Sequence, residues 1–368
     1  MYYECFFELT TKVNCEFDKQ IRFLRKFLRF LRIRHSCYHP IHKLLFRTVS
    51  KMSNCCLPKI RKFVYEKHKA STGCNDVVVV KQDDGSLKAS PLQLHIRVTS
   101  SMQNKIATKQ PKLSRIRVRD NGVDCVTLEC SDWPIGDVEL TNQLSSNELS
   151  ELKLEEGTNQ AFFMIEELNV CIQFFIFLFH PNDKLVVSDI DGTITKSDTI
   201  GFFGGNLGFK VHHENVNKFF HRIHENGYKI IYMTARPIAF QTLTRKYLFE
   251  TLKDNNSNYW HLPLNPVLCL PGDIADAALE DASSCEDGKT SSLSNVLNLF
   301  PDSLSVIVSA FGNNASDSAA YKNVGVPLNI TYLIDKQSKI RNVGTNEEVS
   351  YTILASQIDT LFPQVLQK

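Results

Sequence analysis

The segment Val186–Asp198, VVSDIDGTITKSD, constrains the fold more than any other part of this 368-residue chain. The apolar run Leu185–Val187 predicts a buried strand that ends near Asp189 and Asp191, and Gly192 indicates the turn that follows. Open α/β sheets bind ligands beyond the carboxyl ends of their strands. Two carboxylates spaced i, i+2 can act there on one substrate, one as a nucleophile and the other on a proton. An ordinary Asp-Gly turn is the simpler interpretation, but DxDGT directly after β-branched residues is much more specific.

From Lys184 onward the pattern alternates between expected strands and expected helices. The strands are expected at 185–188, 229–234, 266–270, 305–310 and 329–335. The helices are expected at 213–226, 237–252, 289–299, 315–323 and 351–366. Such alternation predicts a mostly parallel sheet with helices on both faces.

Residues 73–180 have a different character, with short apolar runs separated by turn residues. Strands are expected at 76–81, after Pro91, and at 114–119, 123–129, 161–166 and 170–179. A turn at Asp83–Gly85 predicts that the first two strands form a hairpin. A capping Ser145 predicts a short helix or irregular turns at 145–154. Together these signals predict a β-sandwich-like module.

The net charge of +2 hides a strongly basic N-terminal segment, with fifteen Lys or Arg and one acidic residue between Lys19 and Lys69. On a helical wheel, residues 19–34 separate into an apolar face and a cationic face. The apolar face holds Ile21, Phe23, Leu24, Phe27, Leu28, Phe30 and Leu31. The cationic face holds Arg22, Arg25, Lys26, Arg29 and Arg32. This pattern favours a helix lying in the interface of an anionic membrane over a core helix or a nucleic-acid-binding helix.

Eleven scattered cysteines without a CxxC pair predict reduced thiols in a cytosolic protein. The longest apolar run, Cys171–Phe179, is broken by Gln173 and is too short to span a bilayer. The first residues lack the basic start of a signal peptide. We therefore expect a soluble or peripheral protein.

Three further strand ends carry polar side chains. Thr234 and Arg236 follow an expected strand and precede a helix, an arrangement that can bind phosphate. Lys289 follows Gly288 ahead of an expected helix, where its ammonium can offset a phosphate or a carboxylate. A final set, Asn313 and Asp317, supplies hard oxygen donors suited to Mg²⁺. A helix cap, a surface lysine and a common turn are the simpler alternatives for these three sets.

The order of these parts resembles the haloacid dehalogenase-like phosphotransferase superfamily. SDIDGTITKSD, ENGYK, AR, AFGN and VGVPLN, in this order, are similar to the lipin family of Mg²⁺-dependent phosphatidate phosphatases. GCNDVVVVKQDDGSLKASP and LKLEEGTNQAFFMI also resemble that family, so the likeness covers roughly residues 73–366. It implies an immunoglobulin-like β-sandwich beside a catalytic domain. We therefore expect a basic extension at 1–72, the β domain at 73–180 and the catalytic domain at 181–368.

The resemblance also implies roles for individual residues. Asp189 would be the nucleophile and Asp191 the general acid and base. Mg²⁺ would be held by Asp189, the backbone carbonyl of Asp191 and Asn313, and Asp317 is a further candidate ligand. The substrate phosphate would be bound by Thr193, Thr234, Arg236 and Lys289.

The expected reaction is hydrolysis of phosphatidate to diacylglycerol and phosphate, in glycerolipid synthesis. The expected partner is a phosphatidate-containing membrane and no nucleic acid, while protein partners stay open. The expected location is the cytoplasm, peripheral on the endoplasmic reticulum or nuclear membrane. Two alternatives remain: a soluble phosphatase of the same superfamily that acts on a small phosphate ester, and a non-catalytic module that senses phosphatidate.

Overall fold

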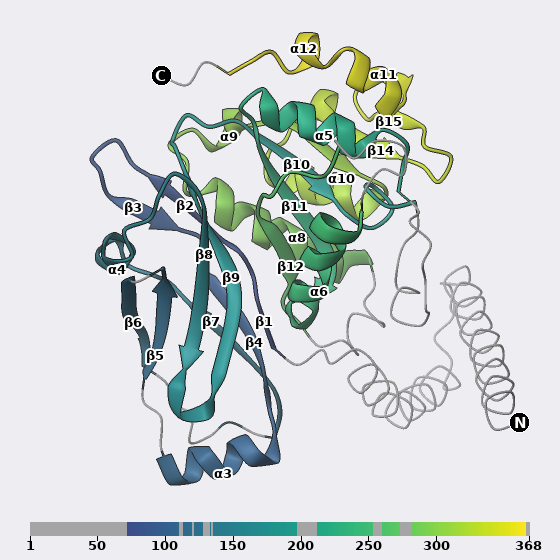
Figure 1. Cartoon of the computed structure of the whole chain (residues 1–368). Coiled ribbons are helices and arrows are strands. Elements are labelled where there is room, and N and C mark those ends of the chain that lie inside the picture. Colours follow the sequence, from purple (N-terminus) through teal and green to yellow (C-terminus); the bar gives the residue numbers. More distant parts are fainter. Residues whose placement is uncertain are drawn as a thin grey trace, which may run out of the picture. The chain divides into compact units, whose positions relative to one another are not determined.

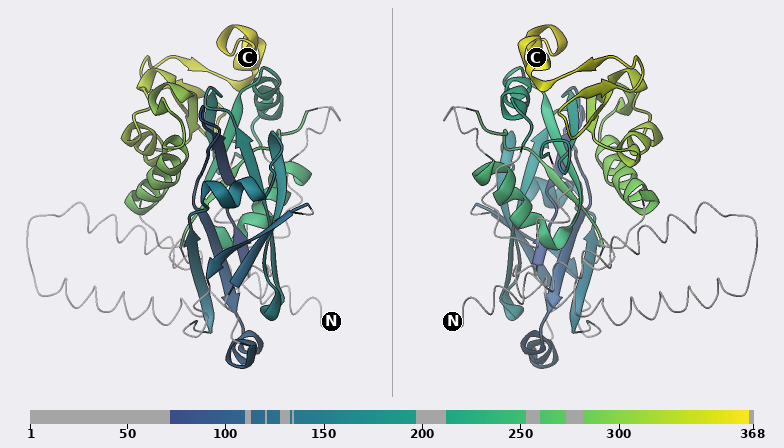
Figure 2. Two further views of the ribbon diagram at one scale, coloured as in Figure 1. Left: turned by 90° about the vertical axis from the view of Figure 1, so that its left-hand side faces the viewer. Right: turned by 90° about the vertical axis from the view of Figure 1, so that its right-hand side faces the viewer.

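The computed structural model describes residues 72–109, 113–119, 121–127, 133, 135–196, 212–252, 260–272 and 282–365. All of these residues belong to one compact unit, Ile60–Lys368. Their fold is mixed α/β and is built on three sheets, which Figures 1 and 2 show from three sides. The membrane-binding helix expected at 19–34 lies outside the described residues, and the expected domain boundaries stay predictions.

A six-stranded sheet has the order β3-β2-β9-β8-β5-β6. Its central strands β8 and β9 alternate between buried and more exposed side chains, as the pleat of a strand requires. The strands are Val77–Lys81 (β2), Leu87–Ala89 (β3), Leu113–Val118 (β5), Asn121–Thr127 (β6), Gly157–Ile165 (β8) and Val170–Phe179 (β9). The strands expected in this part of the chain are confirmed, with small shifts at their ends.

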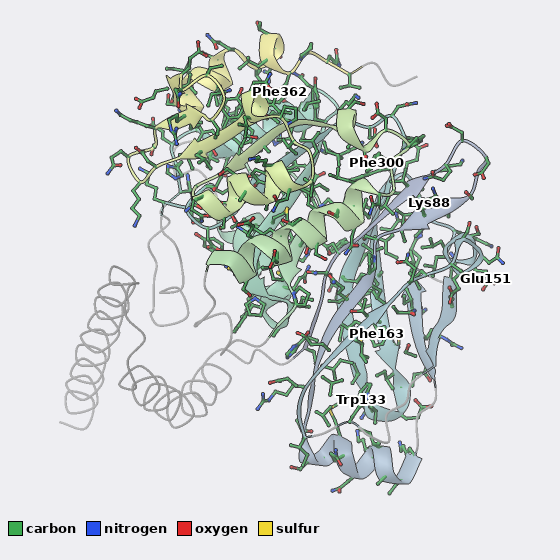
Figure 3. The ribbon with its side chains drawn as sticks, turned by 180° about the vertical axis from the view of Figure 1, so that it is seen from behind. Lys88, Trp133, Glu151, Phe163, Phe300 and Phe362 are labelled. Carbon is green, nitrogen blue, oxygen red and sulfur yellow. The ribbon has the colours of Figure 1, made fainter. Side chains whose placement is uncertain are left out.

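A three-stranded sheet packs against the six-stranded one. It is formed by Thr72–Cys74 (β1), Leu92–Val98 (β4) and Gly136–Asn142 (β7) in the order β1-β4-β7. Side chains of both sheets, including Leu94 and Phe163, form one apolar core (Figure 3). Strands β1 and β7 and the helix α3, Ser100–Lys109, were not predicted from the sequence.

The predicted hairpin is wrong in its second strand. Strand β2 pairs with β3, so the hairpin closes before Pro91. Ser90 makes the last bond to the first strand, donating its N–H to the Val78 carbonyl at 2.8 Å. Pro91 has no N–H to extend the ladder, and β4 beyond it pairs with β1 and β7 of the other sheet.

The short helix expected at 145–154 is confirmed as α4, Ser146–Glu151. The Ser145 side chain caps the helix by accepting the N–H of Glu148, and the Glu148 carboxylate accepts the N–H of Ser145 in return. A 3₁₀ turn, Glu166–Leu168 (η2), joins β8 to β9.

The seven-stranded sheet has the order β12-β11-β10-β13-β14-β15-β16. Its strands are Leu185–Asp189 (β10), Lys229–Pro237 (β11), Val267–Leu270 (β12), Ile307–Gly312 (β13), Thr331–Ile334 (β14), Ile340–Asn342 (β15) and Glu348–Val349 (β16). The first five are parallel, as predicted. The last two are antiparallel and were not predicted.

Apolar cores lie on both faces of this sheet. On one face, Val186 packs with Phe219 of helix α5 (Val216–Glu225) and with Tyr351 of helix α11 (Tyr351–Ser356). On the other face, Val187 packs with Leu293 of helix α8 (Ala282–Leu297) and with Val78 of β2, so the six-stranded sheet shares a core with the seven-stranded one. Figure 3 labels one residue of each core: Phe362 belongs to the core with Val186, and Phe300 belongs to the core with Val187.

The helices broadly follow the predicted order. They are Val216–Glu225 (α5), Gln241–Lys246 (α6), Ala282–Leu297 (α8), Ser303–Val306 (α9), Ala315–Asn323 (α10), Tyr351–Ser356 (α11) and Ile358–Leu361 (α12), with a 3₁₀ turn at Leu328–Ile330 (η6). None of these described helices is long and apolar enough to cross a bilayer. Four cysteines with described side chains, Cys74, Cys171, Cys269 and Cys285, form no disulfide bond with one another, and the reduced state expected for the whole chain stays a prediction.

Three helix predictions need correction. The single helix expected at 351–366 divides into α11 and α12 on either side of Gln357 and ends at Leu361. The helix expected at 237–252 divides into a 3₁₀ turn, Ile238–Phe240 (η4), then α6, then a π-helical turn, Tyr247–Thr251 (η5). The helix expected from Lys289 begins seven residues earlier, so Gly288 lies inside α8 rather than before it. A Cβ at Gly288 would lie only 2.9 Å from a Leu270 methyl carbon, so this glycine permits a close approach of helix and strand.

Candidate active site

Three neighbouring parallel strands bring the candidate residues together at their carboxyl ends. Asp189 is the last residue of β10, the central strand of the three, with β11 and β13 on either side. Thr234 lies near the end of β11, and Asn313 directly follows β13. The arrangement follows from the parallel order of the strands, because their carboxyl ends share one edge of the sheet.

Asp189 is buried and has two polar partners. Its Oδ1 accepts from Lys289 Nζ at 2.6 Å, and its Oδ2 accepts from Thr193 Oγ1 at 3.1 Å. Burial raises the pKa of Asp189 to about 7, although the ammonium of Lys289 opposes the rise. Thr193, expected to bind phosphate, thus donates its hydroxyl to Asp189 in this structure.

Lys289 joins Asp189 to a second buried carboxylate, that of Asp317. Its Nζ also donates to Asp317 Oδ1 at 2.5 Å. Burial alone would lower the pKa of Lys289, but the two carboxylates outweigh it and raise the pKa above its usual range. One ammonium therefore faces two buried carboxylates, and the group has excess negative charge when both are ionised.

Asp191 has different partners from Asp189 and is more exposed, at 20% of its side chain against 4%. Arg236 donates to both of its oxygens, from Nε at 2.9 Å and from Nη2 at 2.6 Å. Thr234 Oγ1 donates to Oδ2 at 2.9 Å. Burial alone would lower the pKa of Arg236, and its pairing with Asp191 raises it. Arg236 and Thr234, expected to bind phosphate, therefore hold the second carboxylate in this structure.

Asp317 organises the loop after β13. It is fully buried, and its Oδ2 accepts the N–H groups of Asn313 at 3.0 Å and Asn314 at 3.1 Å. A Cβ at Gly312 would lie 2.4 Å from the Asp317 Cβ, so only glycine leaves room for this carboxylate under the loop. Both Asp317 oxygens are engaged, and its role as a metal ligand stays a prediction.

Two contributors to the site were missed by the sequence analysis. Tyr351 of α11 donates its hydroxyl to the Thr193 carbonyl at 3.2 Å. A ring nitrogen of His213, Nε2, lies 3.4 Å from the Gly192 carbonyl. Both support the turn after Asp189, where Gly192 has a φ of +90°. Tyr351 lies 158 residues beyond Thr193, and nothing in the local pattern at either residue signals this contact.

The donor set fits a hard divalent cation. The Asp189 carboxylate, the Asp191 carbonyl and the Asn313 amide could together supply oxygen ligands, and the negative charge shared by Asp189 and Asp317 favours a cation. Among the residues that the structure describes, no group of three or more His, Cys, Asp or Glu side chains could hold a metal. The fit therefore depends on carbonyl and amide oxygens as well as on carboxylates.

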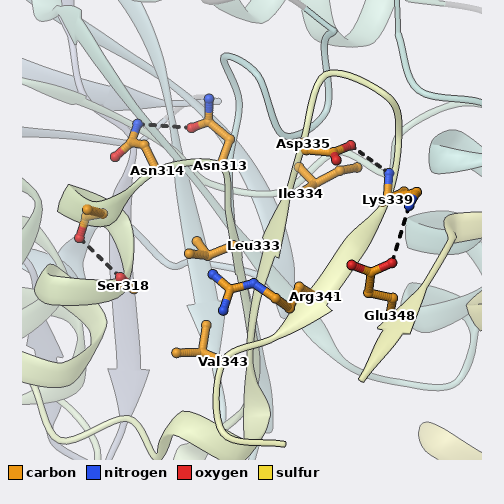
Figure 4. A pocket seen from close by; sticks show the side chains of 11 residues that line it. Asn313, Asn314, Ser318, Leu333, Ile334, Asp335, Lys339, Arg341, Val343 and Glu348 are labelled. Atoms are coloured by element: carbon orange, nitrogen blue, oxygen red, sulfur yellow. Dashed lines mark hydrogen bonds and ion pairs between the residues drawn. The ribbon is translucent and has the colours of Figure 1, made fainter. Parts of the chain in front are cut away.

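A cavity of about 480 Å³ adjoins this site on the side of Asn313 (Figure 4). Its charged lining residues are Lys339 and Arg341, which are cationic, and Asp335 and Glu348, which are anionic. Lys339 and Glu348 pair with each other at 3.4 Å. With balanced charge, this cavity gives no support for a second phosphate-binding position.

Known proteins resemble the part of the chain that holds this site. The family model described as LNS2 (Lipin/Ned1/Smp2) matches residues 140–363. The phosphatidate phosphatase LPIN1 of Homo sapiens is 33% identical to this chain over 61% of the chain and 25% of its own length. The phosphatidate phosphatase LPIN2 of Homo sapiens is 34% identical to this chain over 60% of the chain and 25% of its own length. The phosphatidic acid phosphohydrolase 1 of Saccharomyces cerevisiae is 28% identical over 76% of this chain and 33% of its own length.

This chain thus spans about a quarter to a third of the length of these curated relatives. The family match covers more than half of the 368 residues and includes every candidate catalytic and phosphate-binding residue. The chain belongs to the LNS2 (Lipin/Ned1/Smp2) family.

Proposed function

We propose that this protein hydrolyses phosphatidate to diacylglycerol and phosphate. The observation that carries the proposal is the paired carboxylates of Asp189 and Asp191 at one strand end, each held by a different cation. Such a pair is what a two-step phosphoryl transfer needs, because one group must attack phosphorus while the other handles protons. The names of the relatives supply the substrate.

In the proposed mechanism Asp189 attacks phosphorus in line, forming an O–P bond as the bond from phosphorus to the glycerol oxygen breaks. Asp191, protonated at this stage, gives its proton to that departing oxygen and becomes a carboxylate. Water then attacks the aspartyl-phosphate, Asp191 takes a proton from it, and the Asp189 carboxylate and inorganic phosphate are released. Lys289 offsets the negative charge of the phosphoryl oxygens and of Asp189 throughout.

The proposed cofactor is Mg²⁺. Asp189, the Asp191 carbonyl and Asn313 would hold it, with Asp317 as a further candidate. When bound, it would offset charge on the phosphoryl oxygens and fix their orientation. Its arrival would also relieve the excess negative charge that Lys289 alone leaves between Asp189 and Asp317.

At the level of fold, we propose that the seven-stranded sheet and its helices form a haloacid dehalogenase-like catalytic domain. The strand order, with the nucleophile on a central strand, Thr234 and Arg236 on the neighbouring β11, and Asn313 directly after the neighbouring β13, supports this. For the two smaller sheets we propose an immunoglobulin-like sandwich, on the grounds that they enclose a common core.

We further propose that the protein acts as a peripheral protein on the cytoplasmic side of the endoplasmic reticulum or nuclear membrane, in glycerolipid synthesis. The amphipathic pattern of residues 19–34 supports membrane contact. Deleting residues 1–72 should reduce sedimentation with phosphatidate-containing vesicles and spare hydrolysis of a short-chain phosphatidate. Unchanged vesicle binding would contradict this role for the segment.

The activity is tested by phosphate release from phosphatidate in detergent micelles. With Mg²⁺ we expect release, and with excess EDTA we expect it to stop. A small sugar phosphate in the same assay tests the alternative of a soluble phosphatase that acts on small phosphate esters. Release from the sugar phosphate alone, or from neither compound, would overturn the proposal.

A further inference from the structure

Two buried side chains near the start of the described chain cover the free edge of the catalytic sheet. Among the strands that the structure describes, β12 lies at the edge of the sheet and pairs only with β11. The Asn75 amide accepts the N–H of Cys269 and donates to its carbonyl, both at 2.8 Å. The Asp76 carboxylate accepts the N–H of Val267 at 2.9 Å. These side chains satisfy backbone groups that a further strand would otherwise pair with.

Asp76 also binds a second element, helix α6. It forms a buried ion pair with Arg245 and accepts from Gln241 Nε2 at 3.3 Å. Arg245 in turn lies over the ring of Phe175, 4.0 Å from its centroid. Burial raises the pKa of Asp76 to about 6 against the influence of Arg245, and burial lowers the pKa of Arg245. Burial thus disfavours both charges, and such a pair adds little net stability.

Helix α6 carries the effect of Asp76 toward the active site. Thr244, the neighbour of Arg245 in α6, accepts from Arg236 Nη1 at 3.4 Å through its hydroxyl. Arg236 is the residue that donates to both oxygens of Asp191. The contacts therefore run from Asp76 through α6 to the proposed general acid and base.

Asn75 reaches the site along a different set of contacts. It binds Cys269, and the next residue, Leu270, lies against Gly288 of α8. Gly288 precedes Lys289, the partner of Asp189. Asn75 also supports β12 opposite Thr234, because Cys269 pairs with Thr234 of β11, so Asn75 is a control of similar burial that acts through the sheet rather than through α6.

We infer that Asp76 is a positioning residue for the proposed reaction: through α6 it keeps Arg236 in the two-point contact that orients Asp191. The inference rests on the proposed function. It does not make Asp76 a catalytic residue, because Asp76 is buried away from the reacting atoms and acts through another side chain. Losing it should therefore lower kcat for phosphatidate and leave KM nearly unchanged.

The test is a double-mutant cycle with Arg236→Lys, measured by phosphate release from phosphatidate in mixed micelles with Mg²⁺. Asp76→Asn should lower kcat about tenfold in the wild-type background, since small misplacements of catalytic groups have large effects on rate. In the Arg236→Lys background it should lower kcat less than about twofold, because the contact that it supports is already altered. The control Asn75→Ala should lose the same factor in both backgrounds.

Three results would overturn the inference: an equal loss from Asp76→Asn in both backgrounds, a rise in KM with kcat unchanged, or no loss at all. If the Asp76→Asn protein fails to fold, the double variant Asp76→Asn, Arg245→Gln is used in its place. It removes both charges of the buried ion pair, so neither charge is left without a partner. If Arg236→Lys is inactive, a crystal structure of the Asp76 variant decides. Both Arg236 bonds to Asp191 intact would then refute the positioning role. A wild-type protein that releases no phosphate would instead refute the proposed function.

Discussion

Replacing Lys289 with methionine is expected to destabilise the protein strongly. The Lys289 ammonium lies 2.6 Å from Asp189 and 2.5 Å from Asp317, and its side chain is only 5% exposed. Methionine keeps much of the apolar stem and removes the charge. Removing one partner of a buried ion pair costs about 3–5 kcal/mol. Because two carboxylates lose their shared partner here, we expect a value near the upper end of that range.

Urea unfolding at pH 7.5 in EDTA measures this loss. The matched control is Lys339→Met, which removes an ammonium 3.4 Å from Glu348 in a pair whose side chains are 64% and 59% exposed. An exposed pair contributes about 1 kcal/mol or less. The difference between the two variants isolates the effect of burial on the same chemical change.

Two further measurements test the same explanation of the stability loss. Adding Asp317→Asn to Lys289→Met should restore part of the stability, since one fewer carboxylate then lacks a partner. The loss should also be larger above pH 7.5 and shrink as the pH falls toward 7, because the pKa of Asp189, about 7 with Lys289 in place, rises further without the opposing ammonium, and protonation then removes the unpaired charge. A Lys289→Met protein as stable as Lys339→Met at pH 7.5 would refute the charge balance described for the site.

Three other changes give separate predictions. Gly312→Ala would place a Cβ 2.4 Å from the Asp317 Cβ, so phosphate release should fall about 100-fold through displacement of that carboxylate; release near the wild-type rate would contradict this. Gly73→Ala would place a Cβ 2.0 Å from the Ile238 carbonyl oxygen in η4, so a thermal melt should show a clear fall in melting temperature, and an unchanged melt would count against the packing. Burial would lower the pKa of His95, but two carboxylates of β7 raise it from 6.5 to about 9. The charged His95 should add up to about 3 kcal/mol to the free energy of unfolding, fully below pH 6.5, and this addition should be lost as the pH rises through 9. Urea unfolding of the His95→Gln protein should not show this loss.

The catalytic sheet could be predicted because its elements carry local signals. Each buried parallel strand is a short apolar run, and the polar residue that ends it lies at the functional edge of the sheet. Asp189 and Thr234 were therefore placed from their strands alone. Lys289 reaches Asp189 from α8, although Gly288 was expected to precede that helix rather than lie within it. Glycine serves both as a helix boundary and as a point of close packing, and the sequence does not distinguish these uses.

Other features depend on partners far away in the chain. Asn75 and Asp76 bind a strand that lies 191–194 residues later, and no local pattern reveals this. Arg236 was expected to bind phosphate, but in this structure it binds Asp191. A guanidinium suits phosphate and carboxylate equally well, so only the fold shows which group it reaches. The hairpin error had a similar cause, since Pro91 ends one ladder without showing where the next strand pairs.

The most direct test of the proposed mechanism is phosphate release from phosphatidate by an Asp189→Asn protein. Its thermal melt should first show that it is folded, and the assay should then run in mixed micelles with Mg²⁺ beside the wild type. We predict a loss of at least about a thousandfold, because asparagine cannot form the aspartyl-phosphate. Release within tenfold of the wild-type rate would contradict the assignment of Asp189 as the nucleophile and, with it, the mechanism proposed here.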